Sequence, residues 1–360
     1  MQNTQTVHPA QTEQPSTMKA ARFYGDHDVR IESVPTPTIQ PGEVLLRVLR
    51  SGICGTDASE WKSGPRMFPL AQAHPVTGHL GAMIPGHEFI GEVIDASDST
   101  AFAPGEVVAC GAGVSCGECA RCLEGRTNLC AQYWTLGLSA DGGLAEYVSA
   151  PASTLVRVPD GLDHDLAALA QPLAVGLHAA RRSGVRDGDR VVLIGAGAIG
   201  TFTLAGITAL ADAETTVVDL PGPKLERALR LGATAAVPAD QIDDIPPGAD
   251  IVIEASGVSG QLDRALALVR DGGTIAQVGL PAARQELDVH QLVLHEINLV
   301  TTLAHVCGED LGQALAILET TSLGNELLDS VHPLENLPEQ LDRLARGQVD
   351  GKVIFDPSAA

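Results

Sequence analysis

The 360-residue chain is poor in aromatic residues, in positive charge and in long apolar runs. Aromatic residues make up 3% of it, and 23 Lys and Arg stand against 45 Asp and Glu, for a formal net charge of −22. A surface this acidic repels nucleic acids and anionic lipids, so we expect neither as a partner. No apolar stretch approaches the roughly 20 residues that a membrane-spanning helix needs, so we expect no membrane insertion.

Cysteine is also scarce, and its distribution argues against a disulfide framework. Four of the seven cysteines fall between Cys116 and Cys130. Clustered cysteines are typical of metal ligands in a reducing compartment, so we expect a cytoplasmic protein. The polar segment 1–17 has neither the apolar core of a secretory signal nor the arginines of a transit peptide. We expect a disordered tail there, with the folded chain beginning at Met18.

The rest of the composition, 44% hydrophobic and 19% charged residues, is that of an ordinary globular protein. A length of 360 residues exceeds the usual size of a single core, which predicts two domains. Residues 18–170 and 306–360 are rich in short strand-like segments, whereas residues 171–305 alternate strand and helix patterns. This alternation predicts an α/β Rossmann domain, with a doubly wound parallel sheet, inserted within a β-rich domain.

The segment 195–200 reads Gly-Ala-Gly-Ala-Ile-Gly and directly follows an expected strand over residues 190–194. Glycines at this spacing permit a tight turn, close approach of the backbone to a pyrophosphate and close packing of the next helix. The next apolar run ends at Asp219, whose carboxylate suits the ribose hydroxyls of NAD and repels the 2′-phosphate of NADP. The predicted NAD-binding residues are Gly195, Gly197, Ile199, Gly200 and Asp219.

Four cysteines follow the spacing C-x2-C-x2-C-x7-C within an expected lobe over residues 110–131. Four thiolates on one short segment suit tetrahedral Zn²⁺ with no open position, which predicts a structural zinc site. An iron–sulfur cluster is the alternative for any four-cysteine set, although the compact spacing favours zinc. The predicted ligands are Cys116, Cys119, Cys122 and Cys130.

Cys54, His87 and Glu88 form a second, dispersed set in the segments Gly-Ile-Cys-Gly-Thr-Asp and Gly-His-Glu. Cysteine and histidine suit zinc, and glutamate is an acceptable third ligand. Three protein ligands leave a position for water or substrate, which is the arrangement of a catalytic zinc. On residue types alone, a buried structural thiol and a surface His-Glu pair are an equally good interpretation.

The segments Gly-Ile-Cys-Gly-Thr-Asp and Gly-His-Glu, the four-cysteine lobe and residues 195–200 follow one another in this order along the chain. Together they resemble the motifs of the zinc-dependent medium-chain alcohol and polyol dehydrogenases. The resemblance covers the chain after Met18 and implies a GroES-like catalytic domain beside the dinucleotide domain. Residues 64–82 lengthen the stretch between Cys54 and His87, and this insertion is similar to the 2,3-butanediol (acetoin) dehydrogenase subgroup. Sorbitol and threonine dehydrogenases are close relatives in motif terms.

The resemblance implies that Cys54, His87 and Glu88 hold a catalytic zinc, the second zinc of the chain, and that NAD accepts the hydride. Thr56 would accept the alcohol proton, and Asp57 would orient His87 through its other ring nitrogen. Ordinary turn capping is the alternative role for Thr56 and Asp57. The resemblance also implies a homodimer or homotetramer that acts on a small alcohol or diol.

Two positions depart from the family pattern. Relatives carry a histidine five residues after the cysteine ligand as the last proton relay to solvent. This chain has Ser59 there, so we expect proton release through Ser59 and water, or by another route. Polyol-type relatives carry an acid where this chain has Gln171. A neutral amide is a poor zinc ligand, so we expect Gln171 to contact the metal only through water, leaving a stronger Lewis acid or a more weakly bound zinc.

The sequence thus predicts zinc- and NAD-dependent oxidation of a secondary alcohol or vicinal diol to the ketone, and the reverse reaction. A polyol, sugar or threonine-type dehydrogenase is the alternative among enzymes. A redox-inactive NAD- or zinc-binding protein of the same fold is the alternative from another class. The presence of Cys54, Thr56, His87 and Glu88 argues against that last interpretation and against zinc-free reductases of this fold.

Overall fold

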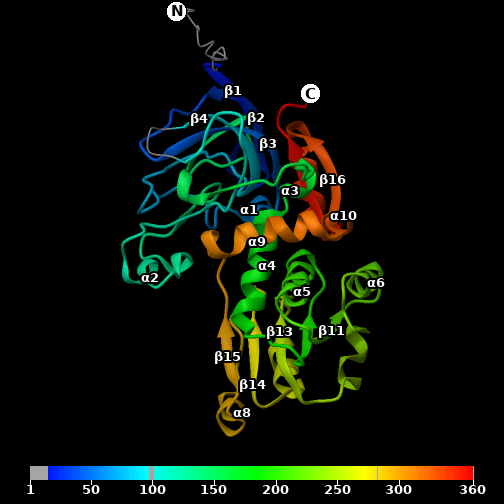
Figure 1. Cartoon of the computed structure of the whole chain (residues 1–360). Helices are drawn as coiled ribbons and strands as arrows, with labels where there is room; N and C mark the ends of the chain where they lie inside the picture. The colour runs from blue at the N-terminus through cyan, green and yellow to red at the C-terminus, as the bar shows by residue number, and fades with distance from the viewer. Residues whose placement is uncertain (1–14, 97–100, 282, 360) are drawn as a thin grey trace, which may run out of the picture.

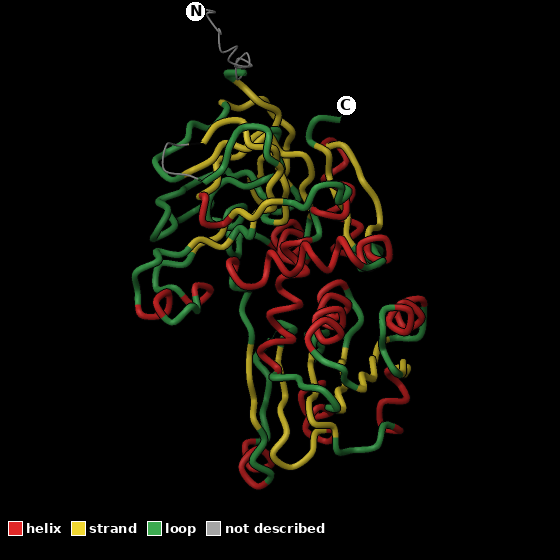
Figure 2. The backbone as a smooth tube through the Cα atoms, in the orientation of Figure 1, coloured by secondary structure: helices red, strands yellow, loops and turns green. Residues whose placement is uncertain are grey.

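The computed structural model describes residues 15–96, 101–281 and 283–359 of the chain. Two sheets lie at opposite ends of the molecule, and helices α4 (Ala170–Ser183) and α9 (Cys307–Thr320) lie between them (Figure 1). The upper part consists mostly of strands and loops, whereas strands and helices alternate in the lower part (Figure 2).

The lower sheet has six parallel strands in the order β12-β11-β10-β13-β14-β15. The chain changes direction across the sheet between β10 and β13, and sheets of this kind bind ligands at the carboxyl ends of their strands. This topology confirms the predicted doubly wound sheet. The strands are β10 (Arg190–Ile194), β11 (Glu214–Asp219), β12 (Ala235–Pro238), β13 (Ala249–Glu254), β14 (Val269–Gln277) and β15 (Asn298–Thr301).

Strand β10 shows why this sheet requires continuous apolar runs. Val191 and Leu193 belong to one buried cluster, and Val192 and Ile194 belong to another. Successive side chains of a strand point to opposite faces, so a strand covered by helices on both faces must be apolar at every position. The helical elements of this part are α5 (Ala198–Leu210), α6 (Pro223–Arg230), η3 (Ala239–Asp244), α7 (Gln261–Leu268) and α8 (Val289–Leu294).

The upper sheet has seven strands, in the order β16-β17-β3-β4-β5-β9 with β8 paired to β3. Its last two strands come from the end of the chain, so the C-terminal segment returns to the sheet that the N-terminal part begins. The strands are β3 (Glu43–Gly52), β4 (Glu88–Ala96), β5 (Val107–Cys110), β8 (Tyr147–Pro151), β9 (Leu155–Arg157), β16 (Leu328–Pro333) and β17 (Lys352–Asp356).

Shorter elements surround the upper sheet. A two-stranded sheet opens the described chain, and a second small sheet and two short helical turns belong to the projecting lobe around α2 (Figure 1). These elements are β1 (Thr17–Gly25), β2 (Asp28–Pro35), α1 (Gly55–Ser63), β6 (Gly113–Val114), α2 (Ala120–Leu123), η1 (Thr127–Leu129), β7 (Trp134–Thr135), η2 (Ala152–Thr154), α3 (His164–Ala167), α10 (Leu323–Leu327), η4 (Leu334–Asn336) and α11 (Leu337–Ala345).

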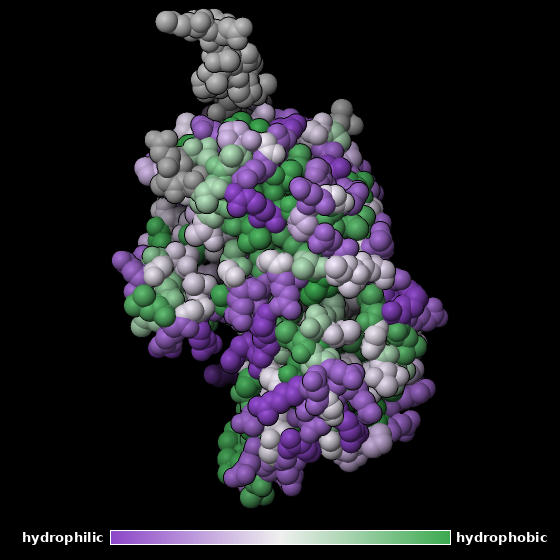
Figure 3. Space-filling model, viewed as in Figure 1, coloured by the Kyte–Doolittle hydropathy of each residue, from purple (hydrophilic) through white to green (hydrophobic). Residues whose placement is uncertain are grey.

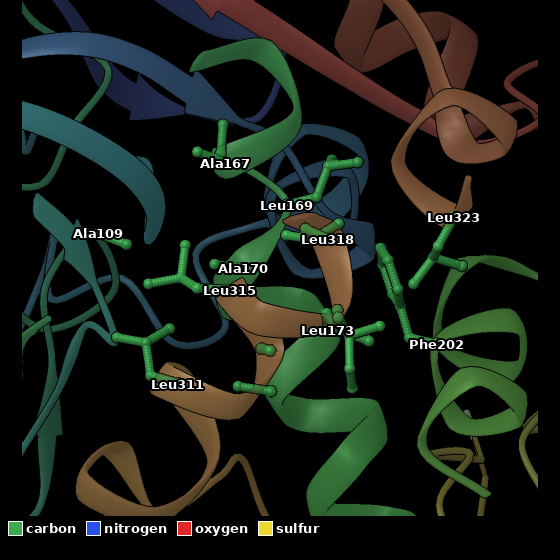
Figure 4. Packing of buried hydrophobic residues seen from close by; sticks show 14 of the residues in the cluster. Ala109, Ala167, Leu169, Ala170, Leu173, Phe202, Leu311, Leu315, Leu318 and Leu323 are labelled. Atoms are coloured by element: carbon green, nitrogen blue, oxygen red, sulfur yellow. The ribbon is translucent and has the colours of Figure 1, made fainter. Parts of the chain in front are cut away.

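A continuous core joins the two parts where α4, α5 and α9 meet. Figure 4 shows Leu173 of α4 beside Phe202 of α5, and Leu315 of α9 belongs to the same buried cluster; each is at most 1% exposed. Each such side chain contributes roughly 1.5–3 kcal/mol of burial free energy. Helices α4 and α9 both contribute to this core, which also includes residues of the upper sheet. The core therefore does not divide at residue 170 or 305, and the domain boundaries there stay predictions.

The structure refines several expected boundaries. The tail expected over residues 1–17 lies outside the described residues up to position 14, and the backbone of Ser16 already pairs with Thr36 before β1 begins at Thr17. Residues 164–183 form two helices, α3 and α4. Strand β15, which the sequence analysis did not identify, completes the parallel sheet. Among the described helices, none is long and apolar enough to cross a membrane.

Apolar side chains lie at several places on the face in Figure 3, and one of these places is the lower tip over α8. Val289, Val293 and Leu294 of α8 are 58%, 70% and 64% exposed. Leu299, on the edge strand β15, is 36% exposed. The open edge of the parallel sheet therefore adjoins an exposed apolar helix.

Candidate active site

Pairing of β3 with β4 brings Cys54 and His87 together. Gly52, the last residue of β3, lies opposite Glu88, the first residue of β4. Cys54 follows β3 by two residues and His87 precedes β4 by one, so both leave the sheet at the same edge. The Cys54 Sγ atom lies 3.0 Å from His87 Nε2. Sheet register thus makes neighbours of two side chains that are 33 positions apart in the sequence.

Cys54 is also the N-cap of α1, where its sulfur accepts a hydrogen bond of 3.3 Å from the Thr56 N–H group. The Asp57 carboxylate reaches back to accept the Cys54 N–H at 2.9 Å, which completes a capping box. Cys54 thus presents its sulfur at the N-terminus of α1, beside His87.

His87 lies between two acidic neighbours, with Cys54 at Nε2 and Asp57 Oδ1 at 3.9 Å from Nδ1. Burial by itself lowers the pKa of His87. The negative charges of Cys54 and Asp57 outweigh this effect and raise the pKa to about 10. His87 Nδ1 and Asp57 Oδ1 are both buried without a hydrogen-bond partner. One ligand atom from each of the three residues lies within 4.8 Å of the others, so the cluster suits a bound cation such as Zn²⁺.

Glu88 faces a different partner. Its carboxylate, 2% exposed, forms an ion pair with Lys352 of β17, whose Nζ also donates to the Ile53 carbonyl at 2.8 Å. Gly52 leaves room for this arrangement, because a Cβ atom there would lie 2.7 Å from Glu88 Oε2. The pair braces the backbone just before Cys54. Asp57 rather than Glu88 joins Cys54 and His87 in the compact group, and the role of Glu88 as a direct zinc ligand stays a prediction.

The remaining predicted residues of this site lie on two helices. Thr56 is half-buried in the first turn of α1, and Ser59 is exposed one turn further along. The Ser59 hydroxyl donates to the Gly55 carbonyl at 2.8 Å, so its lone pairs remain available to water. Gln171 is buried, at 8% exposure, in the first turn of α4. Its predicted water-mediated contact with zinc stays a prediction.

The four cysteines of the projecting lobe converge around one point. Their Sγ atoms are separated by 3.4 Å (Cys130–Cys116), 3.6 Å (Cys119–Cys122), 3.9 Å (Cys119–Cys130) and 4.0 Å (Cys116–Cys122). Thiolates about 2.3 Å from one tetrahedral zinc ion are roughly 3.8 Å apart, so the observed spacing fits a single ion. None of the four forms a disulfide.

Backbone N–H groups in the lobe donate to the cysteine sulfur atoms. Those of Ala131 and Cys122 lower the pKa of Cys119 to about 6. The N–H groups of Cys116 and Gln132 donate to Cys130 Sγ, each at 3.2 Å. These hydrogen bonds hold the sulfur atoms in place as ligands. Four such ligands complete the coordination of a structural zinc ion and leave no open position.

The three glycines of the dinucleotide turn have different structural roles. Gly195 has a φ of +105°, which a side chain would strain, and a Cβ atom at Gly200 would lie 1.9 Å from the Gly195 carbonyl oxygen. A Cβ atom at Gly197, the N-cap of α5, would meet nothing within 4 Å. That open space, at a helix N-terminus, suits the approach of a pyrophosphate. Ile199 is half-buried in the first turn of α5.

Asp219 ends β11 beside this turn, as the sequence predicts. Its carboxylate accepts the Ala196 N–H at 2.5 Å and the Leu220 N–H at 2.7 Å. The side chain is half-buried, and it is held at the carboxyl edge of the sheet next to the glycine turn. A fixed anion at this place suits two ribose hydroxyls and disfavours a 2′-phosphate.

Comparison with known proteins agrees with this geometry. Residues 40–160 match the family model described as "Alcohol dehydrogenase GroES-like domain", and residues 198–320 match "Zinc-binding dehydrogenase". Sorbitol dehydrogenase of Bacillus subtilis is 34% identical over 296 residues, which cover 79% of this chain and 82% of that protein. The chain belongs to the zinc-dependent alcohol and polyol dehydrogenases. It is an oxidoreductase that acts on CH–OH groups with NAD and zinc.

Two further similarities place butanediol enzymes near this dehydrogenase. (R,R)-butanediol dehydrogenase of Bacillus subtilis is 31% identical over 288 residues, covering 78% of this chain and 82% of that protein. The crystal structure of 2R,3R-butanediol dehydrogenase from Bacillus subtilis superposes with a TM-score of 0.86 at 27% identity, covering 95% of this chain and 100% of that chain. The predicted family is thereby confirmed, and butanediol dehydrogenases are among its members similar to this chain.

Sequence reasoning missed one charged residue at the site of this dehydrogenase. Lys352 is 3% exposed and lies 299 positions from Ile53, whose carbonyl it binds. The sequence analysis gave this lysine no role. A lysine opening an otherwise apolar strand, Lys-Val-Ile-Phe, was the available signal, because a buried lysine requires a carboxylate partner.

Proposed function

We propose that this dehydrogenase oxidises small vicinal diols or secondary alcohols of the 2,3-butanediol type to ketones with NAD, and catalyses the reverse reaction. The observation that carries the proposal is the 3.0 Å approach of Cys54 and His87 at the N-terminus of α1. The other end of α1 leads directly into residues 64–82, the insertion that resembles the butanediol subgroup.

The insertion is fixed to α1 by a buried carboxylate. Glu60, 1% exposed, accepts the N–H groups of Arg66 and Met67 at 2.9 and 2.6 Å. Phe68 packs edge-on against Phe23 with ring centroids 4.8 Å apart. One helix therefore positions both the proposed metal ligands and the start of the insertion. This supports the proposal that the insertion forms a wall of the alcohol pocket.

Zinc would supply a Lewis acid for the alcohol hydroxyl, and NAD would supply the hydride acceptor. Cys54 and His87 would hold the metal, with Cys54 at the N-terminus of α1. Asp57, whose Oδ1 lies 3.9 Å from His87 Nδ1, would help to orient the ring by charge attraction rather than by a direct hydrogen bond. Lys352 neutralises Glu88, so the site does not accumulate a further uncompensated negative charge.

Two hydroxyls of α1 provide a route for the alcohol proton. Thr56 Oγ1, two residues after Cys54, accepts the proton near the metal. Ser59, exposed one helical turn away, passes protons to solvent water through its free lone pairs. Each hydroxyl that gains a proton must release its own at the same time, because neither side chain is stable in a charged form near neutral pH. The proton route therefore requires a connected chain of these hydroxyls and water.

The substrate proposal is tested by NADH formation at 340 nm with 2,3-butanediol, sorbitol and threonine, each with and without a chelator. We expect kcat/KM to be at least about tenfold higher for butanediol than for the other two, because a pocket shaped for a small diol loses contacts with other substrates. Chelation is expected to abolish all turnover. A higher kcat/KM for sorbitol or threonine contradicts the diol proposal, and the absence of any turnover favours a redox-inactive protein.

We also propose a homodimer formed through the apolar edge of α8 and β15. Val293 is 70% exposed on α8, and an apolar surface of this kind is typical of protein interfaces. Val293→Asp is expected to convert the dimer to a monomer, which sedimentation velocity detects, because the partner would have to bury an unpaired charge. Wild-type protein that sediments as a monomer contradicts the proposal.

A further inference from the structure

The loop that follows β15 is held in an uncommon backbone conformation. Ala304 has a φ of +47°, in the left-handed region that residues with a side chain rarely adopt. The loop lies at the carboxyl edge of the parallel sheet, on the β13–β14–β15 side of the crevice where a dinucleotide crosses the sheet. Strained residues persist only where their surroundings fix them, and they are common at ligand sites.

On one side of Ala304, the four-cysteine lobe holds the loop. Asn128 lies in η1, between Cys122 and Cys130, and is 2% exposed. Its Nδ2 donates to the Leu303 carbonyl at 2.7 Å. A side chain whose position depends on the metal-binding segment therefore fixes the residue immediately before Ala304.

On the other side, the upper sheet holds the loop. His305 is 5% exposed, and its Nε2 lies 3.0 Å from the Gly111 carbonyl, which requires a proton on that nitrogen. Gly111 permits this contact because a Cβ atom there would lie 2.9 Å from His305 Cε1. Ala304 is thus flanked by two hydrogen bonds that come from outside the dinucleotide-binding part.

A buried polar network sets the direction of Asn128. His178 of α4 lies with Nε2 at 3.3 Å from Asn128 Nδ2 and with Nδ1 at 3.2 Å from Asp310 Oδ2. Asp310 is fully buried and also accepts from the Val306 N–H at 2.8 Å. The network joins the lobe to α4 and α9, so a small displacement of the lobe would also displace the loop around Ala304.

We propose that Asn128 and His305 are positioning residues that hold the Leu303–His305 loop in the conformation required for dinucleotide binding. The four-cysteine lobe would then support cofactor binding in addition to its own fold. This inference rests on the proposed function, since it assumes that NAD binds along the carboxyl edge of the sheet. Neither Asn128 nor His305 contacts the reacting atoms in this account.

The test is a fluorescence titration with NADH on the zinc-loaded, full-length protein. Asn128→Ala is expected to raise the Kd for NADH about tenfold, the effect of losing one buried hydrogen bond that preorganises the site. Zinc content is expected to stay at two per chain. Adding Ala304→Gly is expected to restore most of the affinity, because glycine adopts the left-handed conformation without support. Leu123→Ala, a 77% exposed position on the same lobe, is the control and should bind NADH as wild type.

A second pair of variants decides the matter if Asn128→Ala loses zinc. His305→Ala lies outside the lobe and is expected to raise the Kd for NADH to a similar extent, whereas His305→Gln, which retains a donor near the Gly111 carbonyl, should bind nearly as wild type. Wild-type affinity in both alanine variants overturns the inference while leaving the proposed function intact. Failure of the wild-type protein to bind NADH overturns both.

Discussion

Replacing Cys54 with alanine is expected to reduce kcat/KM for the alcohol by at least about 10³-fold and to remove one of two zinc ions per chain. A Lewis acid contributes several kcal/mol to transition-state stabilisation, and each 1.4 kcal/mol corresponds to a factor of ten in rate. The four-cysteine lobe keeps its own ligands and should retain its metal. Metal analysis of purified protein, combined with initial rates of NADH formation, measures both effects.

Cys110→Ala provides the matched control. Cys110 is fully buried at the end of β5 and forms no part of either metal cluster. Its replacement should leave two zinc ions and near wild-type rates. A Cys54→Ala protein that keeps two zinc ions and substantial activity would show that the metal is held elsewhere, and the assignment of Cys54 and His87 would be wrong.

Gly200→Ala is expected to damage both the fold and cofactor binding. The new Cβ atom would lie 1.9 Å from the Gly195 carbonyl oxygen, so α5 must move away from β10. Overpacking of this kind costs about 3 kcal/mol of unfolding free energy, and the displaced helix N-terminus loses its alignment with the pyrophosphate. Denaturant unfolding and NADH titration measure the two effects.

Gly197→Ala separates cofactor binding from stability. No heavy atom lies within 4 Å of the Cβ position, and the φ of −65° is accessible to alanine. Stability should therefore change by less than about 0.5 kcal/mol, whereas the methyl group occupies the space proposed for the pyrophosphate and should weaken NADH binding at least about tenfold. Unchanged NADH affinity in Gly197→Ala would refute the proposed position of the pyrophosphate.

The features that the sequence predicted well are those specified by local pattern. The apolar runs before Gly195 and Asp219 became adjacent parallel strands, β10 and β11, because a strand buried on both faces leaves a continuous apolar signature. The lobe cysteines lie within fifteen residues of one another, so their convergence needs only short loops. Spacing along the chain was sufficient in both cases.

The features that the sequence left undetermined depend on contacts between distant segments. Lys352 meets Glu88 only because β17 returns to β3, and Asn128 meets Leu303, 175 positions away, only because the lobe folds against the dinucleotide-binding part. No local periodicity encodes such pairs. The role expected for Glu88 came from the Gly-His-Glu motif, which is silent about the lysine that the fold places against it.

The account depends most on a metal between Cys54 and His87, and anomalous diffraction at the zinc edge from crystals grown with NAD measures this directly. We expect two zinc peaks per chain, one within bonding distance of Cys54 Sγ and His87 Nε2 and one among the four lobe cysteines. The same map would show whether Glu88 remains with Lys352 or turns to the metal. A single peak confined to the lobe, in protein that oxidises the alcohol, would contradict the account.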